Sequence, residues 1–598
     1  MEFKSNLFTY FSIAVFNVIM LFIIICGVEN LGKSSEYNFL YMGAFLIITC
    51  FIVLLFNCVL YILSKEFIHD FMKKNKSVIE FIILMLILIT GLYLRIRVIK
   101  SLPMKLESDY KTYYDIARLL QNGTLSTEGE GLCDYIAKFP HVMGYPYILS
   151  LIFRIFGDSL NTGLYFGVLS SIVCSFFIYK IVRYISGSIA ALFAVFISTF
   201  WPSQIFFSNF LASEPVFNCM LFGCFLWFVY ITKKYNEFSG QSYMGIVKYI
   251  ILGMLLAFAS AVRPMAMILL IAIIIVLLSS KIYLKKDILD TPVSLVFISK
   301  GWRCVILILV SYLICSNVIT AHIEDRIGRN VANGIDSFGY NLLVGTNIDS
   351  DGGWNDGDAK LLEDSYNTTN SATEAQKICR DKAITRVKNN YVGTFNLMFK
   401  KFTLLWNNDD YSPAINIICM DNQGTLNSKI EKYLYDYMKV CNYYYLFVVI
   451  FSWLAGMIAI LKKSDLSHTM ILLFIGTVIT HMCLESQPRY HYYAMQIISI
   501  LGAVGVGDIY KYYRNLSKEK IAYNSSSHDF IIENKHIEAT EESSLNKMKN
   551  HNFPEESNFF DMEKAIIEGH VKITVTEEYS EKYNFYMNNI YFNIGVDV

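Results

Sequence analysis

Long runs of apolar side chains dominate this chain and constrain its fold more than any other feature. Hydrophobic residues make up 54% of the 598 residues, charged residues only 17%, and the mean hydropathy is +0.40. A soluble domain could not bury this much apolar surface, and the excess comes in blocks close to the roughly 20 residues that cross a bilayer as a helix. The sequence therefore predicts an all-α polytopic membrane protein with about 12 transmembrane helices. The predicted spans are Leu7–Val28, Phe39–Leu63, Val78–Ile99, Leu160–Val182, Ser188–Trp201, Glu214–Ile231, Ile246–Val262, Pro264–Leu278, Val305–Thr320, Tyr443–Leu461, Met470–Leu484 and Tyr490–Val506.

Basic residues gather in the loops on one side of these spans. Lysine and arginine are enriched in cytoplasmic loops, so their distribution orients a membrane protein. The bias predicts that both termini are cytoplasmic. It places four segments outside: Leu102–Ser159, Pro202–Ser213, Ala321–Asn442 and Glu485–Arg489. The first span lacks the basic flank and cleavage site of a signal peptide, so we expect it to be retained.

The spans and loops divide the chain into five parts. We expect two extra N-terminal membrane helices at 1–64, a membrane core at 65–320 with its first outer loop at 102–159, an extracytoplasmic segment at 321–442, C-terminal membrane helices at 443–510 and a polar cytoplasmic tail at 511–598. The end of the tail alternates well enough for two strands. The zero net charge gives no reason to expect a nucleic-acid partner, and the lack of a glycine-rich phosphate loop disfavours a nucleotide-driven pump. Thirteen cysteines without a close CxxC pair give no zinc or redox signal.

Two acidic residues stand at the predicted outer surface. Asp109 follows the third predicted span, and Tyr113 lies one helical turn later, so both can share a helix face. A solvated amphipathic helix explains this pair equally well. Glu214 opens a later span directly after Ser213, where helix capping is an equally good explanation. Because it lies on the same side as Asp109, the two acids could share a cleft or a divalent cation.

Two arginines at the same level could hold an anion. Arg263 stands with Pro264 at a predicted outer turn, and Arg489 precedes Tyr490 at the start of the last span. Snorkelling and aromatic-belt anchoring explain such clusters in about half of cases. Anchoring of this kind could explain any one of the polar sites at Glu214, Arg263 and Arg489. It is a weaker explanation for all three in one chain.

Six short motifs between Val78 and Tyr510 occur in a characteristic order: SDYKTYYDIA, GYP, IFGDSLNTGL, LASEPVF, AVRP and ESQPRY. The GYP motif precedes an apolar stretch that is too short to span a membrane, which is typical of an interfacial helix. In order and topological side, the set resembles the GT-C superfamily of integral-membrane glycosyltransferases. It is most similar to the branch often called family 39, which contains the protein O-mannosyltransferases and the lipid A aminoarabinose transferase. The resemblance implies a GT-C-type bundle with amphipathic helices in the first outer loop and a longer, mixed outer segment.

This resemblance implies an inverting transfer of a hexose or pentose from a polyprenyl-phosphate donor. The acceptor is a protein, a lipid or a cell-envelope polymer, glycosylated at the outer face of the cell membrane. Asp109 would act as general base, and Glu214 matches the second acidic position. Arg263 and Arg489 match arginines that would bind the donor phosphate, because a guanidinium can hold two phosphate oxygens.

The chain departs from the family pattern at two places. Ser108 separates Glu107 from Asp109, where many relatives carry adjacent acids. Many relatives also have a lysine before paired prolines where this chain has HVMGYP, so Lys138 and His141 are further candidates for phosphate binding. The remaining predicted site residues are Tyr113, Tyr145 and Tyr490 for substrate binding, and Asp109 and Glu214 as ligands if a divalent cation takes part; no other cofactor is expected.

The long outer segment carries the run VGTNIDSDGGWNDGD. Its glycine, asparagine and aspartate residues predict tight turns first and a calcium loop second, because the spacing does not fit an EF-hand. Trp354, Trp406 and Tyr411 could stack on sugar rings or on polyprenyl. We therefore expect the segment to take part in acceptor recognition.

A transporter or flippase for lipid-linked glycans is the main alternative function, and a polysaccharide polymerase would share the same substrates. Transporters place ionisable residues near the midplane of the bilayer and show paired halves or broken helices. Here the distinctive acids lie at the ends of spans, and the two halves of the chain do not match. The sequence therefore favours the enzyme.

Overall fold

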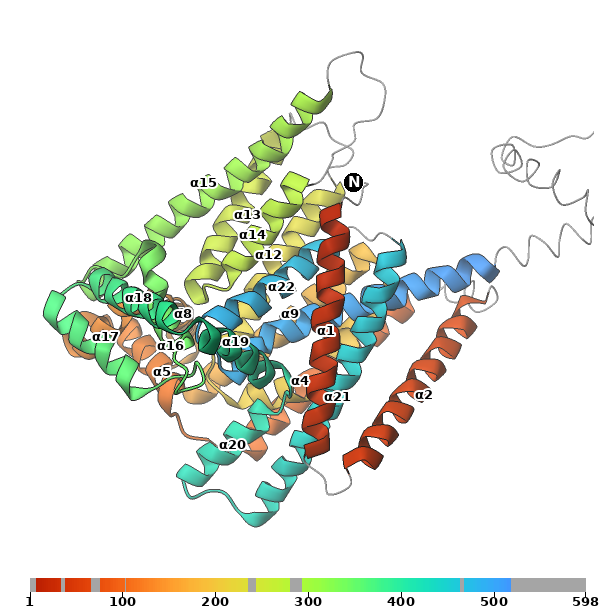
Figure 1. The fold of residues 1–598 in the computed structure, drawn as a ribbon, viewed down its shortest axis with the longest axis horizontal. Helices are drawn as coiled ribbons and strands as arrows, with labels where there is room; N and C mark the ends of the chain where they lie inside the picture. The colour runs from red at the N-terminus through yellow and green to blue at the C-terminus, as the bar shows by residue number, and fades with distance from the viewer. Residues whose placement is uncertain are drawn as a thin grey trace, which may run out of the picture. The chain divides into compact units, whose positions relative to one another are not determined.

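The protein is a helical bundle in its described part. The computed structural model describes residues 7–33, 38–65, 76–102, 104–234, 243–279, 293–462 and 467–517, and every regular element in these ranges is a helix (Figure 1). Nine of these helices are long and apolar enough to cross a membrane, or ten if the bent pair Ser188–Thr199 and Pro202–Asn209 is one span. With the shorter apolar helices Ala266–Ser279 and His468–Cys483, they coincide with the twelve predicted spans. The predicted all-α polytopic class is confirmed.

Helices are the expected solution for these apolar runs, because a helix satisfies its backbone hydrogen bonds internally where no water is available. The last span runs over Pro488–Ser517. The elements in chain order are α1 (Leu7–Lys33), α2 (Asn38–Ser64), α4 (Lys76–Ser101), α5 (Ser108–Asn122), α6 (Leu125–Glu128), α7 (Glu130–Lys138), η1 (Pro140–Val142), α8 (Gly144–Phe156), α9 (Leu160–Ile185), α10 (Ser188–Thr199), α11 (Pro202–Phe206), η2 (Phe207–Asn209), α12 (Glu214–Lys234), α13 (Tyr243–Val262), α14 (Ala266–Ser279), α15 (Val293–Ile327), η4 (Gly334–Phe338), α16 (Gly339–Gly345), α17 (Asp356–Thr369), α18 (Ala372–Asn389), α19 (Tyr391–Trp406), α20 (Tyr411–Asn422), α21 (Ser428–Lys462), α22 (Ser467–Cys483) and η5 (Pro488–His491).

The long outer segment differs from the expected mixed structure. Residues 321–442 contain helices and turns but no strand. The glycine- and asparagine-rich run forms the turn that joins α16 to α17, and the two long helices α15 and α21 continue into the segment from either side. Polar residues extend these two helices because most of them are good helix formers in water as well. The two strands predicted for the tail lie outside the described residues.

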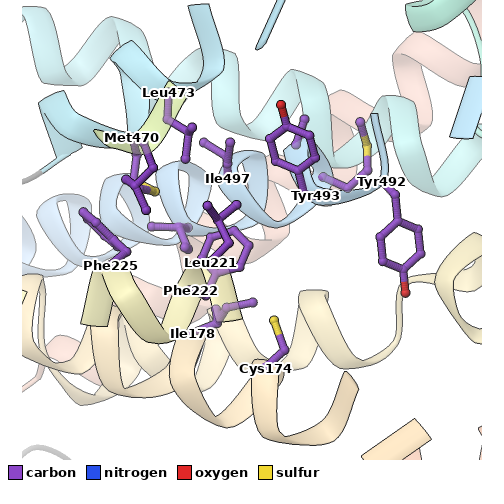
Figure 2. Close-up of a cluster of buried hydrophobic side chains, with 14 of the residues drawn as sticks. Cys174, Ile178, Leu221, Phe222, Phe225, Met470, Leu473, Tyr492, Tyr493 and Ile497 are labelled. Carbon is purple, nitrogen blue, oxygen red and sulfur yellow. The ribbon is translucent and has the colours of Figure 1, made fainter. Parts of the chain in front are cut away.

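The core of the bundle forms where α9 packs against α4, α10 and α12. Figure 2 shows a second junction in this core, where side chains of α9, α12, α22 and the last span meet. Phe222 and Phe225 of α12 and Ile497 of the last span are fully buried there. By contrast, α2 and α4 expose rows of large apolar side chains, as expected of surfaces that face lipid.

A sharp bend separates α10 from the short helices α11 and η2 that follow it. The two pieces are bent by 52°, and Pro202 occupies the first turn of α11. Arg95 of α4 closes the end of α10, because its Nη1 donates to the Thr199 carbonyl oxygen at 2.9 Å and to that of Gly91 at 3.2 Å. Cationic donors suit the C-terminal carbonyls of a helix. This buried arginine therefore has a structural role in the bundle.

Candidate active site

Asp109 lies in the first turn of α5, a short amphipathic helix. The helix buries Tyr110, Ile116, Ala117 and Leu120 on one face and ends at Gly123, which adopts the left-handed conformation with φ 76°. Ser108, directly before Asp109, also has positive φ, at 49°. This conformation is unusual for a residue other than glycine, and such backbone strain is often found at functional sites. The loop at 102–159 thus carries amphipathic helices, as predicted.

Asp109 forms an ion pair with Arg489, which lies 380 positions later in the sequence. The Arg489 Nη2 donates a hydrogen bond to Asp109 Oδ2, and its Nε donates to Gln487 Oε1 at 3.0 Å. The guanidinium carbon also lies 5.8 Å from the centre of the Tyr490 ring. The arginine is the more buried partner, since its side chain is 11% exposed and that of Asp109 is 37% exposed.

The turn that carries Arg489 is held from both sides. His491 hydrogen-bonds the Leu405 carbonyl oxygen through Nδ1 at 2.6 Å and Asp409 Oδ1 through Nε2 at 2.9 Å. Before the turn, the Lys401 Nζ donates to the carbonyl oxygens of Met482 and Leu484 at 3.0 and 2.6 Å. Burial lowers the pKa of this lysine to about 8. These contacts fix the end of α22 and the start of the last span, and so position Arg489.

Glu214 and Arg263 form a second acid–arginine pair. Glu214 begins α12, and Arg263 follows the last residue of α13; Arg263 Nη2 lies 2.5 Å from Glu214 Oε1. The contact is an ion pair but lacks the geometry of a hydrogen bond, and both Glu214 oxygens are therefore without a hydrogen-bond partner. The Arg263 Nε donates instead to Ser213 Oγ at 2.9 Å. Burial alone would lower the pKa of Arg263, but the charge of Glu214, together with Tyr113 and Tyr490, outweighs it and the pKa is raised.

Gly144 of the GYP motif explains how Arg263 reaches this place. A Cβ atom at Gly144 would lie 2.1 Å from the carbonyl oxygen of Ala261 and 2.8 Å from the backbone nitrogen of Val262. Only a glycine lets the start of α8 approach the end of α13 so closely. The motif therefore packs the interfacial helix directly against the turn that carries Arg263.

Both pairs line one cavity of about 350 Å³. This volume is at the lower end of the roughly 300–1,000 Å³ of small-molecule sites. The structure thus brings together the four charged residues that the sequence singled out at separate span ends. Other predicted residues among the lining are Tyr113, Lys138, His141 and Tyr490.

Lys138 and His141 differ in character from the two arginines. The ammonium group of Lys138 already pairs with Glu363 and lies 4.9 Å from the centre of the Tyr366 ring. Burial, assisted by the charge of Arg263, lowers the pKa of His141 to about 4. His141 is therefore uncharged at neutral pH and can contribute a hydrogen bond to a phosphate, but no positive charge.

Tyr145 is placed differently from the other two predicted tyrosines. It is not among the residues that line the cavity, and its ring packs edge-on against that of Tyr113, with ring centres 5.4 Å apart. Tyr145 therefore supports Tyr113 from behind and does not face the cavity. Trp406, a candidate platform for sugar rings, is likewise fully buried against Phe474 and His491, whereas Trp354 is 59% exposed and lines the cavity.

The glycine-rich turn near Trp354 is closed by protein groups. The Asp358 carboxylate accepts hydrogen bonds from Asn347, Asn355 and Arg386 at 2.5–3.0 Å. Burial would raise the pKa of Asp358, but these bonds and the Arg386 charge hold it below its usual value. Of the two structures predicted for this run, tight turns and a calcium loop, the tight turns agree with this geometry.

The described residues do not form an evident metal centre. Among them, no three His, Cys, Asp or Glu side chains lie close enough together to hold a metal ion. Asp109 and Glu214 each face a guanidinium, so these two carboxylates alone do not make the oxygen-rich set that a divalent cation requires.

Several lining residues were not predicted from the sequence. Asn218 lies one turn after Glu214 within an apolar helix, and His481 lies near the end of another. A single polar residue in an apolar helix is most often a core residue, so no local signal distinguished them. Glu485 was noticed only as a neighbour of Arg489; burial raises the pKa of its carboxyl group.

Fold and cavity together define a polytopic membrane protein with a charged site at the ends of its spans. Residues 140–321 match the family model of the dolichyl-phosphate-mannose-protein mannosyltransferases. This match confirms the resemblance to GT-C glycosyltransferases that the motifs indicated. No curated protein sequence matches the chain.

Solved structures similar to this chain include the following three. The oligosaccharyltransferase of Archaeoglobus fulgidus with zinc and sulfate aligns with 12% identity and a TM-score of 0.38, over 73% of this chain and 51% of its own. The archaeal oligosaccharyltransferase AglB of the same organism, with an inhibitory peptide and a dolichol-phosphate, aligns with 10% identity and a TM-score of 0.39, over 83% and 54%. ArnT from Cupriavidus metallidurans bound to undecaprenyl phosphate aligns with 11% identity and a TM-score of 0.29, over 73% and 78%. The alignments with the two archaeal chains span only about half of their length.

Proposed function

We propose that this protein is a membrane glycosyltransferase that moves a sugar from a polyprenyl-phosphate donor to an acceptor at the outer face of the membrane. The main observation behind the proposal is that the ion pairs Asp109–Arg489 and Glu214–Arg263 line the same cavity at the ends of spans. A lipid-linked sugar phosphate has an anionic group next to a polar ring and remains in the bilayer, which fits a charged cavity at this position. The match of residues 140–321 to dolichyl-phosphate-mannose-protein mannosyltransferases supports the same class of donor.

The two arginines would act on the donor phosphate. Breaking the bond between the anomeric carbon and the phosphate oxygen leaves negative charge on polyprenyl phosphate, and a fixed guanidinium stabilises that charge as it develops. Arg489 is the better candidate, because it sits in a turn held by buried contacts and lies beside Tyr490. Arg263 lies at the same cavity and would add a second positive charge.

Asp109 would act on the acceptor. As the acceptor oxygen or nitrogen attacks the anomeric carbon from the face opposite the phosphate, the carboxylate removes its proton, and the configuration of the sugar inverts. In this structure Asp109 is paired with Arg489. A donor phosphate that competes for Arg489 would release the carboxylate, so donor binding would prepare the base for the acceptor.

The outer segment is the best candidate for the acceptor side. Its residues Tyr340, Asn341, Trp354 and Glu363 line the cavity together with the membrane helices. An exposed tryptophan at such a site suits contact with a sugar ring or a flexible chain. A protein, a lipid and a cell-envelope polymer are all acceptors compatible with this surface.

The central test is sugar transfer by the purified full chain in lipid nanodiscs, with radiolabelled polyprenyl-phosphate hexoses and pentoses and with peptide and lipid acceptors. Asp109→Asn should lower the rate by about 10² to 10⁴, the usual contribution of general-base catalysis, while the protein remains folded. Asp115→Asn, on the same helix but not among the cavity-lining residues, should behave like the unchanged protein. Normal transfer by Asp109→Asn would exclude the assigned base, and movement of the lipid-linked sugar across the bilayer without any transfer would support a flippase instead.

A further inference from the structure

Part of the cavity is lined by buried polar atoms that have no hydrogen bond of good geometry among the described residues. These atoms are the side-chain oxygen of Asn218, both ring nitrogens of His481, although the Glu485 backbone interacts with that ring, and both carboxylate oxygens of Glu214, of which Oε1 faces Arg263 in an ion pair. Each of these residues is only 3% exposed, and all three line the cavity. Buried polar groups in native proteins almost always have partners, so these atoms are available to bind polar groups that enter the cavity.

The three residues come from neighbouring elements. Glu214 and Asn218 are four residues apart on α12 and therefore share one face of that helix. His481 lies near the end of α22, with its ring stacked on Tyr490 at 5.4 Å between centres. Tyr493 of the last span joins the two helices, because its ring packs edge-on against Phe217 of α12 and its hydroxyl is 2.8 Å from Thr477 Oγ1 of α22. Figure 2 shows Tyr493 at this junction of α12, α22 and the last span.

The types of atom define the ligand that fits. Glu214 and Asn218 offer oxygen acceptors, and a neutral histidine offers one acceptor and one donor. A phosphate has only acceptors when ionised and would be repelled by Glu214. Hydroxyl groups can donate to the oxygens of Glu214 and Asn218 and to the unprotonated ring nitrogen of His481, and they can accept from its N–H. The group that completes this part of the cavity is therefore a polyol rather than an anion.

We propose that Glu214, Asn218 and His481 form a subsite that binds hydroxyl groups of the donor sugar. This inference rests on the proposed function and adds the orientation of the donor to it. The sugar ring lies against α12 and α22, and the phosphate lies toward Arg489, next to the Tyr490 ring on which His481 stacks. Asn218 and His481 then determine which sugar is accepted, and they leave binding of the lipid phosphate unaffected.

The test compares two ligands on the same detergent-purified full chain. One is sugar-free polyprenyl phosphate, and the other is the polyprenyl-phosphate sugar that the unchanged protein binds most tightly among mannose, glucose, galactose and arabinose forms. We expect the sugar to improve affinity at least about tenfold, as one or two hydrogen bonds to a charged or buried group would. Asn218→Ala and His481→Phe should each remove most of this gain while affinity for sugar-free polyprenyl phosphate changes less than about twofold. Phenylalanine retains the ring that stacks on Tyr490.

Two matched controls are available in the bundle. His468 lies on the same helix as His481 and is equally buried, but bonds Ser12 Oγ at 2.6 Å. Asn17 of α1 is also a buried asparagine whose side-chain oxygen lacks a partner, but it does not line the cavity. His468→Phe and Asn17→Ala should therefore keep the full preference for the sugar-bearing lipid. Retained binding of sugar-free polyprenyl phosphate shows that each variant is folded.

The outcomes separate this inference from the proposed function. Variants that keep the sugar preference, or that lose affinity for both lipids equally, would overturn the subsite while transfer by the unchanged protein still supports the enzyme. If the unchanged protein shows neither a preference for the sugar-bearing lipid nor transfer, the proposed function itself fails.

Discussion

The surroundings of each ionisable side chain in the cavity determine whether it is charged. The guanidinium groups of Arg263 and Arg489 are largely buried beside carboxylates, whereas the nearby His141 lies half-buried beside Arg263 and stays neutral. The sequence placed all of these residues at one membrane face, because charges stand out at the ends of apolar runs. It could not predict that Asp109 pairs with Arg489, since nothing local connects positions 380 residues apart.

His141 should make the protein less stable in acid. Its pKa is lowered from 6.5 to about 4 in the folded state by burial and by Arg263, so between these values the unfolded chain binds a proton that the folded chain does not. Stability from this group is complete above about pH 6.5 and falls as the pH drops toward 4. Thermal unfolding in detergent between pH 7 and 4.5 should show a shallower loss for His141→Gln than for the unchanged protein. Identical pH slopes for the two proteins would contradict the buried, neutral state of His141.

At the scale of elements, the apolar runs predicted the helices well, and close contacts between helices escaped prediction. The spans follow from length and hydropathy alone, but the tight approach of α8 to α13 depends on one glycine within a degenerate GYP motif. His481 and Asn218 escaped notice for a similar reason: only the packing of α12 against α22 and the last span reveals that they line a cavity.

Gly144→Ala should impair the site more than the fold. The added methyl group would meet the Ala261 carbonyl oxygen at 2.1 Å, and relief of this overlap requires the end of α13, with Arg263, to move. Overpacking of this kind typically costs about 1–3 kcal/mol. Transfer activity should fall at least about tenfold, because small displacements of a charged binding group are costly. Gly167→Ala in α9, where a Cβ meets no atom within 4 Å, is the control and should retain activity and melting temperature. Equal activity of both variants would show that the contact between α8 and α13 does not position Arg263.

At the scale of the whole molecule, the site is assembled from the loop at 102–159, four membrane helices and the segment at 321–442. Asp109 and Glu214 each face an arginine, so neither of these two carboxylates needs a bound cation to balance its charge. We therefore expect transfer activity to survive removal of divalent cations. Full activity after dialysis against EDTA is the expected result, and loss of activity that Mg²⁺ or Mn²⁺ restores would show that a cation completes the site. A zinc-free reaction buffer and a metal assay of the dialysed protein make the two outcomes unambiguous.

The distribution of lysine and arginine among the loops predicts how the bundle is oriented in the membrane. Asp364 is exposed on α17 in the segment at 321–442, and Lys511 is exposed near the C-terminal end of the last span. Because cytoplasmic loops are enriched in lysine and arginine, Asp364 should lie outside and Lys511 inside. A membrane-impermeant maleimide should label Asp364→Cys in intact cells, and Lys511→Cys only after permeabilisation. The unchanged protein gives the background, which should be low because most of its described cysteines are buried or half-buried. The reverse labelling pattern would place the cavity at the cytoplasmic face, and the donor would then have to be a lipid-linked sugar on that side of the membrane.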